Sequence, residues 1–148
     1  MKPTNEVKFV FDSKSVNESF ARGAVSAFVA HLDPTIEELA DIKTAVSEAV
    51  TNCVVHAYPS QICKVYITAR IYEDARVVIL IKDKGVGIPD IAKAMQAGYT
   101  TGADDRAGMG FAVMQAFCSR VKLRSGVGKG TTVTLEKRIA KQKPIYSR

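Results

Sequence analysis

The sequence has no tryptophan, and it contains only three cysteines and two histidines among its 148 residues. Cys53, Cys63 and Cys118 form no Cys-x-x-Cys pair, and His31 and His56 are the remaining soft ligands. A structural zinc site is therefore not expected. The cysteine usage predicts free thiols in a reducing, cytoplasmic compartment.

Long apolar runs are also missing. The longest strongly apolar run, Val77 to Ile81, is far shorter than the roughly 20 residues that cross a bilayer as a helix. Residues 1–12 are polar and lack the apolar segment of a secretory leader, so we expect neither a signal peptide nor a membrane anchor. The length suits one domain with its own core. We expect residues 1–136 to form this domain and 137–148 to form a basic tail.

The net charge of +6 is a prominent feature of the composition. Much of the excess falls near the end of the chain, at Lys137, Arg138, Lys141, Lys143 and Arg148. A phosphate-bearing ligand or an acidic protein partner would suit this charge. No platform of alternating aromatic and basic residues is visible, so we expect no direct contact with nucleic acid. A nucleic-acid module is the remote alternative, and a steep salt dependence of DNA binding would reveal it.

Hydrophobic periodicity predicts strands and helices in a definite order. The expected strands are 7–11, 65–71, 77–82, 121–125 and 131–137, and the expected helices are 15–31, 34–57, 90–97 and a last one from 110. Ser15 and Glu18 match a capping box, and Pro34 suits the first position of the second helix. This order predicts an α+β fold, with helices stacked on one face of a mixed, mainly antiparallel sheet.

One apolar stretch of the second predicted helix carries three polar side chains at regular spacing. Glu48, Asn52 and His56 stand four residues apart, so on a helix they lie near one stripe at the rim of the buried face. One interpretation is an ordinary helix whose polar groups bond to nearby backbone. The other is an active-site helix, with Glu48 as a general base and Asn52 as an oxygen ligand of Mg²⁺.

A second polar motif follows the central predicted strand. Asp83-x-Gly85-x-Gly87 places a carboxylate at the strand end and two glycines where backbone could approach a flat ligand. An ionised Asp83 could accept a hydrogen bond from the amine of adenine, whereas the carbonyl of guanine would face it as a second acceptor. The alternative is an Asx turn. The spacing fits no Rossmann fingerprint, and Gly128-Lys129 lacks Walker spacing and reads as a hairpin turn.

The segment 106–111 has the sequence Arg106-Ala107-Gly108-Met109-Gly110-Phe111 and precedes the last predicted helix. Free backbone amides and the helix dipole at such a start suit an anion such as a triphosphate. An ordinary helix start is the alternative. The preceding run 99–110 is rich in Gly, Thr and Asp, and long loops of this kind are commonly functional.

Together these motifs resemble the GHKL ATPase family, which includes gyrase, Hsp90 chaperones, MutL proteins and histidine kinases. Glu48-x-x-x-Asn52 resembles the N box of the family, Asp83-x-Gly85-x-Gly87 its first glycine box and Gly108-x-Gly110 its second. Within this family the chain is similar to the anti-sigma F serine kinases of endospore-forming bacteria. That similarity covers Asn17 to Arg22, Leu32 to Thr35 and Val46 to Asn52, and it continues through the glycine motifs.

The resemblance implies an ATP-binding kinase fold and a set of residue roles. Glu48 would be the base for a substrate serine, and Asn52 would hold Mg²⁺. The residues implied for the ATP site are Asn52, Asp83, Gly85, Gly87, Thr100, Thr101, Arg106, Gly108, Gly110 and Thr131. Asp83 and Thr131 would read adenine, and Thr100, Thr101 and Arg106 would lie in a lid.

The resemblance also implies three protein contacts. A homodimer would hold sigma F through the first helix, where Arg22 matches an arginine used by the family. The same dimer would phosphorylate a serine of an anti-anti-sigma protein. Two alternatives are a general-stress anti-sigma B kinase and a regulator that binds ATP without catalysis. A histidine kinase fits less well, because the chain lacks room for a dimerising helical hairpin and His56 lies inside the nucleotide helix.

Overall fold

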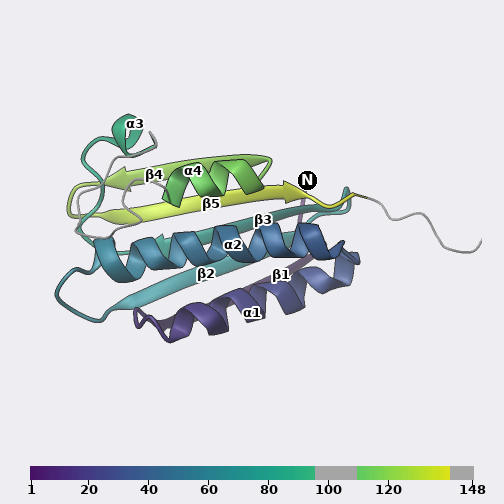
Figure 1. The fold of residues 1–148 in the computed structure, drawn as a ribbon, viewed down its shortest axis with the longest axis horizontal. Helices are drawn as coiled ribbons and strands as arrows, with labels where there is room; N and C mark the ends of the chain where they lie inside the picture. Colours follow the sequence, from purple (N-terminus) through teal and green to yellow (C-terminus); the bar gives the residue numbers. More distant parts are fainter. Residues whose placement is uncertain (96–109, 141–148) are drawn as a thin grey trace, which may run out of the picture.

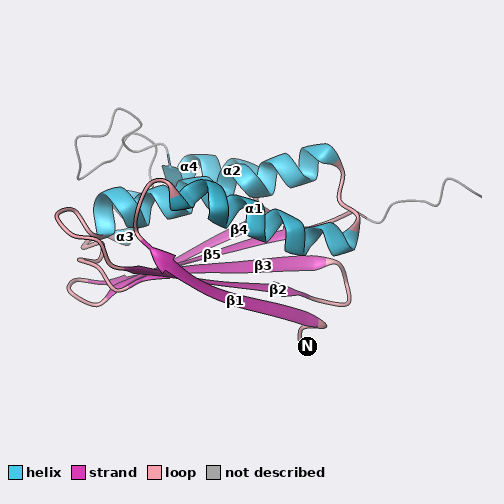
Figure 2. Ribbon diagram, turned by 90° about the horizontal axis from the view of Figure 1, so that it is seen from below, coloured by secondary structure: helices cyan, strands magenta, loops and turns pink. Residues whose placement is uncertain are grey.

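The computed structural model describes residues 1–95 and 110–140. In this part, five strands form one sheet and the helices lie on one of its faces (Figure 1, Figure 2). The strands are β1 (Asn5–Asp12), β2 (Lys64–Ile71), β3 (Arg76–Asp83), β4 (Arg120–Gly126) and β5 (Gly130–Arg138). The helical elements are α1 (Asn17–Val29), η1 (Ala30–Leu32), α2 (Ile36–Asn52), η2 (Cys53–Ala57), α3 (Ile91–Ala94) and α4 (Gly110–Phe117).

The strand order is β1-β2-β3-β5-β4, which places the most apolar strand at the centre as its sequence predicts. All four pairings between the described strands are antiparallel. The predicted two-layer α+β fold is therefore confirmed, and the sheet is antiparallel rather than mixed over the described strands. The pairs β2–β3 and β4–β5 are hairpins, and α1 and α2 return the chain from β1 to its antiparallel neighbour β2.

The core lies between the sheet and the helices α1, α2 and α4. Strand β2 alternates strictly between buried and partly exposed residues, so one of its faces packs under the helices and the other meets solvent. Figure 2 shows the helical layer along one face of the sheet and nothing drawn on the other. Large side chains that are fully buried include Ile42, Val46, Ile67, Ile81, Met114 and Leu135.

The start of α1 differs from its prediction. Its N-cap residue is Val16, and no side chain caps it, so the expected Ser15–Glu18 capping box is absent. The reason is a backbone turn, in which the carbonyls of Lys14 and Ser15 accept from the N–H groups of Asn17 and Glu18. These bonds satisfy two donors that a capping side chain would otherwise satisfy.

The start of α2 carries a capping box that the sequence analysis did not identify. Thr35 is its N-cap, and Pro34 therefore precedes the helix instead of opening it. The Thr35 hydroxyl accepts from the Glu38 N–H at 3.0 Å, and the Glu38 carboxylate accepts from the Thr35 N–H at 2.9 Å. A Thr followed three residues later by Glu is the usual sequence sign of this motif.

The last strand continues beyond residue 136. Strand β5 ends at Arg138, and Ile139 is buried in the core. Lys137 pairs with Asp41 at 3.1 Å and also donates to the Phe117 carbonyl at 2.9 Å, so it ties β5 to α2 and α4. Across the described ranges, every helix is too short or too polar to pass through a bilayer.

Candidate functional site

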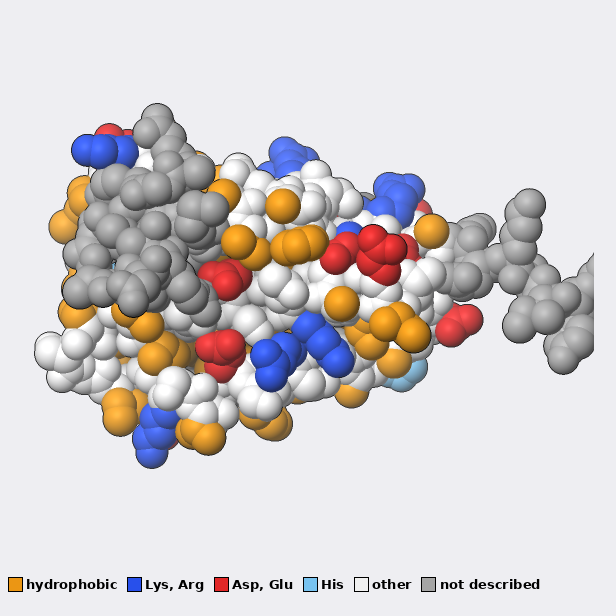
Figure 3. All heavy atoms as spheres, viewed as in Figure 1, with side chains coloured by type: hydrophobic (Ala, Val, Ile, Leu, Met, Phe, Trp, Pro, Cys, Tyr) orange, Lys and Arg blue, Asp and Glu red, His pale blue; other side chains and the backbone are white. Residues whose placement is uncertain are grey.

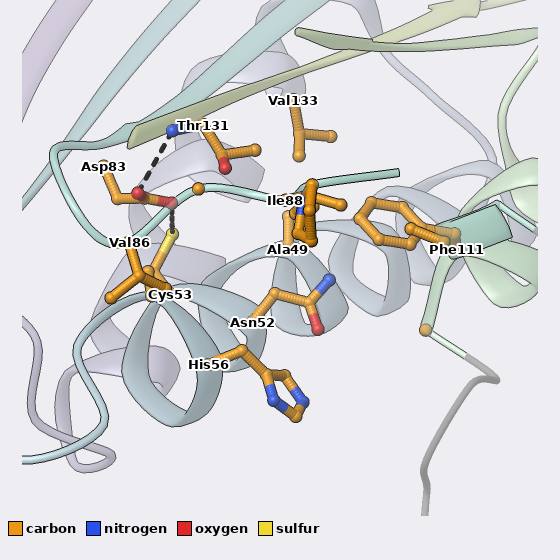
Figure 4. Close-up of a pocket in the computed structure, with 15 residues that line it drawn as sticks. Ala49, Asn52, Cys53, His56, Asp83, Val86, Ile88, Phe111, Thr131 and Val133 are labelled. Carbon is orange, nitrogen blue, oxygen red and sulfur yellow. Dashed lines mark hydrogen bonds between the residues drawn. The ribbon is translucent and has the colours of Figure 1, made fainter. Parts of the chain in front are cut away.

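Helix α2 supplies the polar stripe, but it does not continue as a regular helix to residue 57. It ends at Asn52, and Cys53–Ala57 form a π-helical turn. In such a turn each backbone hydrogen bond joins residues five apart instead of four apart. The predicted extent is confirmed, whereas the regular geometry is wrong. Asn52 and His56 both line a pocket beside this turn (Figure 4).

Strand β3 delivers Asp83 to the floor of the same pocket. Its side chain is 4% exposed, and its Oδ1 atom accepts from the backbone N–H groups of Gly85 at 2.9 Å and Thr131 at 3.2 Å. Its Oδ2 atom faces the thiol of Cys53 at 3.6 Å, as Figure 4 shows. A thiol is a weak donor, so Oδ2 keeps most of its capacity to accept a hydrogen bond from a ligand.

Burial determines the proton affinity of this carboxyl group. Desolvation raises the pKa of Asp83, and the hydrogen bonds from Gly85, Cys53 and Thr131 oppose the rise. Burial and the neighbouring Asp83 also raise the pKa of the Cys53 thiol well above its usual value. Cys53 is therefore a neutral donor beside the carboxyl group and not a thiolate.

The two glycines after Asp83 are required by close backbone packing. A Cβ atom on Gly85 would lie 2.2 Å from the Ala57 carbonyl oxygen, which accepts a bond from the next residue, Val86. Gly87 has a φ of +80°, and a Cβ atom there would lie 2.1 Å from the Gly126 carbonyl oxygen. The glycine loop thus packs between the π turn and the β4–β5 hairpin, and both positions exclude a side chain.

A hydroxyl pair lies next to Asp83 in the wall of the pocket. Thr131 and Ser125 face each other across β5 and β4, and their hydroxyl oxygens are 2.7 Å apart. Ser125 also accepts from the Ile88 N–H at 2.7 Å and donates to the Gly130 carbonyl at 3.1 Å. These bonds join the glycine loop to the hairpin, and they leave Thr131 on the pocket surface with Ser125 behind it.

The side chain of Asn52 stands apart from these networks. Its Nδ2 atom is buried and has no hydrogen-bond partner in the described part of the chain. An unpaired buried donor costs about 1–3 kcal/mol, so it is a position where a polar ligand would be stabilising. In Figure 4 the amide points into the pocket between His56 and Phe111.

Glu48 lies one helical turn before Asn52, near the start of α4. A Cβ atom on Gly110 would lie 3.5 Å from Glu48 Oε2 and 3.5 Å from Asn52 Oδ1. The two predicted active-site side chains therefore meet at the same glycine. Glu48 also borders a groove between α1 and α2, which is lined in addition by Glu18, Arg22, Lys43 and Ser47.

Arg22, the predicted sigma contact, lies in this groove and outside the pocket. Its Nη1 atom is 3.4 Å from the Ser47 hydroxyl, and its side chain is half-buried. Figure 3 shows acidic and basic side chains close together on this helical face. The remaining predicted site residues, Thr100, Thr101, Arg106 and Gly108, lie outside the described residues.

Several residues that build the pocket do not belong to any of the predicted motifs. Cys53, Ser125 and Ile88 were not predicted, and neither was Tyr58, whose hydroxyl accepts from the Lys84 N–H at 2.6 Å and donates to the Lys64 carbonyl at 2.9 Å. Their partners are 5 to 37 residues away in the chain. No local pattern identifies such pairs.

The donor set shows what the pocket could bind. Oδ2 of Asp83 offers a buried acceptor, Asn52 offers an unpartnered amide, and apolar surfaces of Val86, Ile88 and Phe111 lie between or beside them. A flat ligand with an amino group and a polar, anionic extension would match this arrangement. No cluster of three His, Cys, Asp or Glu within residues 1–95 and 110–140 could hold a metal ion alone.

Comparison with known proteins gives concordant results. The family model described as a histidine kinase-like ATPase domain matches residues 11–137. An anti-sigma F factor from Caldanaerobacter subterraneus subsp. tengcongensis is 52% identical over 97% of this chain and all of its own length. One from Geobacillus kaustophilus is 49% identical over 95% of this chain and 97% of its own length.

A solved structure shares the fold. The RsbU and RsbW domains of a Mycobacterium tuberculosis protein match with a TM-score of 0.70 and 24% identity, covering 94% of this chain and 33% of that one. The range 11–137 matched by the family model includes the pocket-lining residues of β3 and β5. The two anti-sigma F factors match nearly the whole chain. The chain therefore belongs to the anti-sigma F factor family, and its domain has the histidine kinase-like (GHKL) ATPase fold.

Proposed function

We propose that this chain is an ATP-dependent serine protein kinase that also binds and inhibits sigma F. Its phosphorylation substrate would be the anti-anti-sigma factor. One observation carries the kinase part: Asn52 from α2 and Asp83 from β3 line one pocket, although 30 residues separate them in the chain, and Glu48 lies beside Asn52 at Gly110, which also lines this pocket. The family name of the relatives supports the sigma part.

Adenine would bind against the floor of the pocket. Asp83 Oδ2 would accept a bond from the adenine amine, since Oδ1 is already occupied by two backbone donors. Gly87 would lie beside the base, and Ile88 and Phe111 would cover it. Guanine would present a carbonyl oxygen to the same acceptor, so ATP should be preferred over GTP.

The phosphates would lie toward Asn52 and the start of α4. Asn52 Oδ1 is an oxygen ligand of the kind that Mg²⁺ prefers, and its unpartnered Nδ2 could donate to a phosphate oxygen. Mg²⁺ in nucleotide sites commonly takes one or two protein ligands, with phosphate oxygens and water completing its coordination. Bound Mg²⁺ would supply neutralisation of phosphate charge. Backbone amides at Gly110 would add further donors at a helix N-terminus.

Glu48 would act as the general base. It lies one turn from Asn52 on the same helix, so a phosphoryl group held at Asn52 is within reach of a hydroxyl held at Glu48. Phosphoryl transfer depends mainly on positioning and charge neutralisation. The serine must still lose its proton, and a carboxylate at this place would accept it.

The α1–α2 groove would contact protein partners. Arg22 and Lys43 supply positive charge there, and the groove extends to Glu48. We propose that Arg22 contributes to capture of sigma F by a homodimer. Contact with sigma at Arg22 would not require the nucleotide pocket, because Arg22 does not line that pocket.

The central test is Glu48→Gln, which keeps size and polarity but removes the base. We expect ATP binding by calorimetry within about twofold of the original chain, and loss of serine phosphorylation by at least about a hundredfold, the typical range for a general base. Full phosphotransfer by this variant would refute the role of Glu48. ATP binding without phosphotransfer in the unmodified chain would instead identify a non-enzymatic regulator.

The partner test uses Arg22→Ala, and Lys43→Ala measures the contribution of the second positive charge in the same groove. We expect the Arg22 variant to phosphorylate the anti-anti-sigma factor normally and to capture sigma F more weakly in a pull-down. Capture of sigma B in preference to sigma F by the unmodified chain would favour the general-stress alternative. Unchanged sigma F affinity on Arg22→Ala would refute the role of Arg22.

A further inference from the structure

Ser125 stands directly behind the pocket wall, where it contacts a pocket-lining residue but not the pocket itself. We infer that Ser125 is a positioning residue that fixes the Thr131 hydroxyl as a hydrogen-bond acceptor toward the ligand and so determines which base the pocket selects. This inference rests on the proposed function, because the ligand concerned is a purine nucleoside triphosphate.

The number of available protons determines the direction of the bonds. Ser125 has one hydroxyl proton and three neighbours: the Ile88 N–H at 2.7 Å, the Thr131 hydroxyl at 2.7 Å and the Gly130 carbonyl at 3.1 Å. The Gly130 carbonyl can only accept, and the Ile88 N–H can only donate. All three bonds form together in a single arrangement, in which Ser125 donates to Gly130 and accepts from both Ile88 and Thr131.

In this arrangement the Thr131 proton is used inside the wall. Thr131 then presents only oxygen lone pairs to the pocket, and it does so next to the Oδ2 acceptor of Asp83. Thr131 is 9% exposed and lies directly across from Ser125 in the strand register, so its hydroxyl has little freedom to choose another partner. Figure 4 shows Asp83 and Thr131 side by side on this wall.

Two neighbouring acceptors select the chemistry of position 6 of a purine. A 6-amino group, or a water molecule that donates to the wall, satisfies them, whereas a 6-oxo group adds a third acceptor. Without Ser125, the Thr131 hydroxyl could turn and donate to a 6-oxo group. The loss of Ser125 should therefore weaken discrimination against 6-oxo purines, in addition to any general weakening.

The test measures ATP and ITP binding by calorimetry for the unmodified chain, Ser125→Ala and Ser125→Thr. ITP differs from ATP by a 6-oxo group and its N1 proton. The Kd for ITP divided by the Kd for ATP therefore measures how strongly the pocket discriminates at this part of the base. For Ser125→Ala we expect the ratio to fall by about tenfold, corresponding to one hydrogen bond. Ser125→Thr keeps the hydroxyl and should restore the original ratio.

A control variant on the same strand keeps the result interpretable. Thr132→Ala removes a hydroxyl from the other face of β5 and should leave both Kd values unchanged. A purely structural role of Ser125 through Ile88 would weaken ATP and ITP equally, and an unchanged ratio would overturn the inference while ATP binding itself remains. If the unmodified chain binds no ATP at all, the proposed function fails first, and the inference fails with it.

Discussion

Replacement of Asp83 by Asn separates base recognition from folding at a single atom. The Asn carbonyl can occupy the place of Oδ1 and keep the bonds from the Gly85 and Thr131 N–H groups. The Asn amide then takes the place of Oδ2, where the original carboxylate meets the Cys53 thiol and the pocket. The variant should therefore fold, and it should present a donor to the ligand in place of an acceptor.

The expected increase in the Kd for ATP has two causes. Loss of a hydrogen bond to a charged group removes about 1.5–3 kcal/mol, and two donors left facing each other cost about 1–3 kcal/mol more. Their sum corresponds to an increase in the Kd for ATP of about a hundredfold to ten-thousandfold. GTP should respond in the opposite direction, because its carbonyl can accept from the new amide. Calorimetry with both nucleotides measures the two changes, and ATP affinity equal to that of the unmodified chain would refute the role of Asp83.

The same variant makes a prediction about pH. Burial raises the pKa of Asp83 in the folded chain, so folding favours the neutral acid. The contribution of this group to stability is then complete below the unfolded pKa of about 3.9, and it is lost as the pH rises through the folded value. Asn does not titrate, so Asp83→Asn does not lose stability in this way. As the pH rises from 3 to 7, the variant should therefore become more stable relative to the original chain, measured as the difference between their free energies of unfolding. Urea unfolding at several pH values measures it, and a decrease would contradict the assigned cause.

Two further predictions concern the packing at glycine and cysteine positions. Gly85→Ala should destabilise the chain by more than about 3 kcal/mol in urea unfolding, because its Cβ atom would overlap a backbone carbonyl. Gly23→Ala, which has open space around it in α1, should instead stabilise the chain by about 0.5–1 kcal/mol. Equal effects of the two substitutions would contradict this packing. Burial raises the pKa of Cys118 to about 11, so alkylation of this thiol at pH 8, followed by mass spectrometry, should be about two hundredfold slower in the folded chain than in urea. Similar rates in the two states would show that Cys118 is not protected.

The strands and the main helices could be predicted because their signals are local. The alternation of Val65, Ile67, Ala69 and Ile71 corresponds to a strand with one buried face, and the apolar run at 77–81 corresponds to the central strand. The missed cap of α2 also had a local signal, since Thr35 and Glu38 have the spacing of a capping box. The Ser15 prediction used the same rule and was wrong, because backbone bonds already satisfied the helix start.

The interior of the candidate site could not be predicted in the same way. The Asp83, Gly85 and Asn52 motifs identify groups that face a ligand, but the groups behind them come from other elements. Cys53, at the start of the π turn, contacts Asp83 from 30 residues away in the chain. Nothing in hydrophobic periodicity distinguishes a π turn from an α turn, since both bury nearly the same residues.

The two layers of the fold divide the work of the site between them. The helical layer carries Glu48 and Asn52, the groups suited to phosphate and proton chemistry, whereas the sheet layer carries Asp83 and Thr131, the groups suited to base recognition. Hydrogen bonds that link the two layers near the pocket floor include the Cys53 thiol to Asp83, the Val86 N–H to the Ala57 carbonyl and the Lys84 N–H to the Tyr58 hydroxyl. A nucleotide that contacts both layers would add to these links. The proposed activity depends on that joining, because the base fixed by the sheet sets where the terminal phosphate meets the helix.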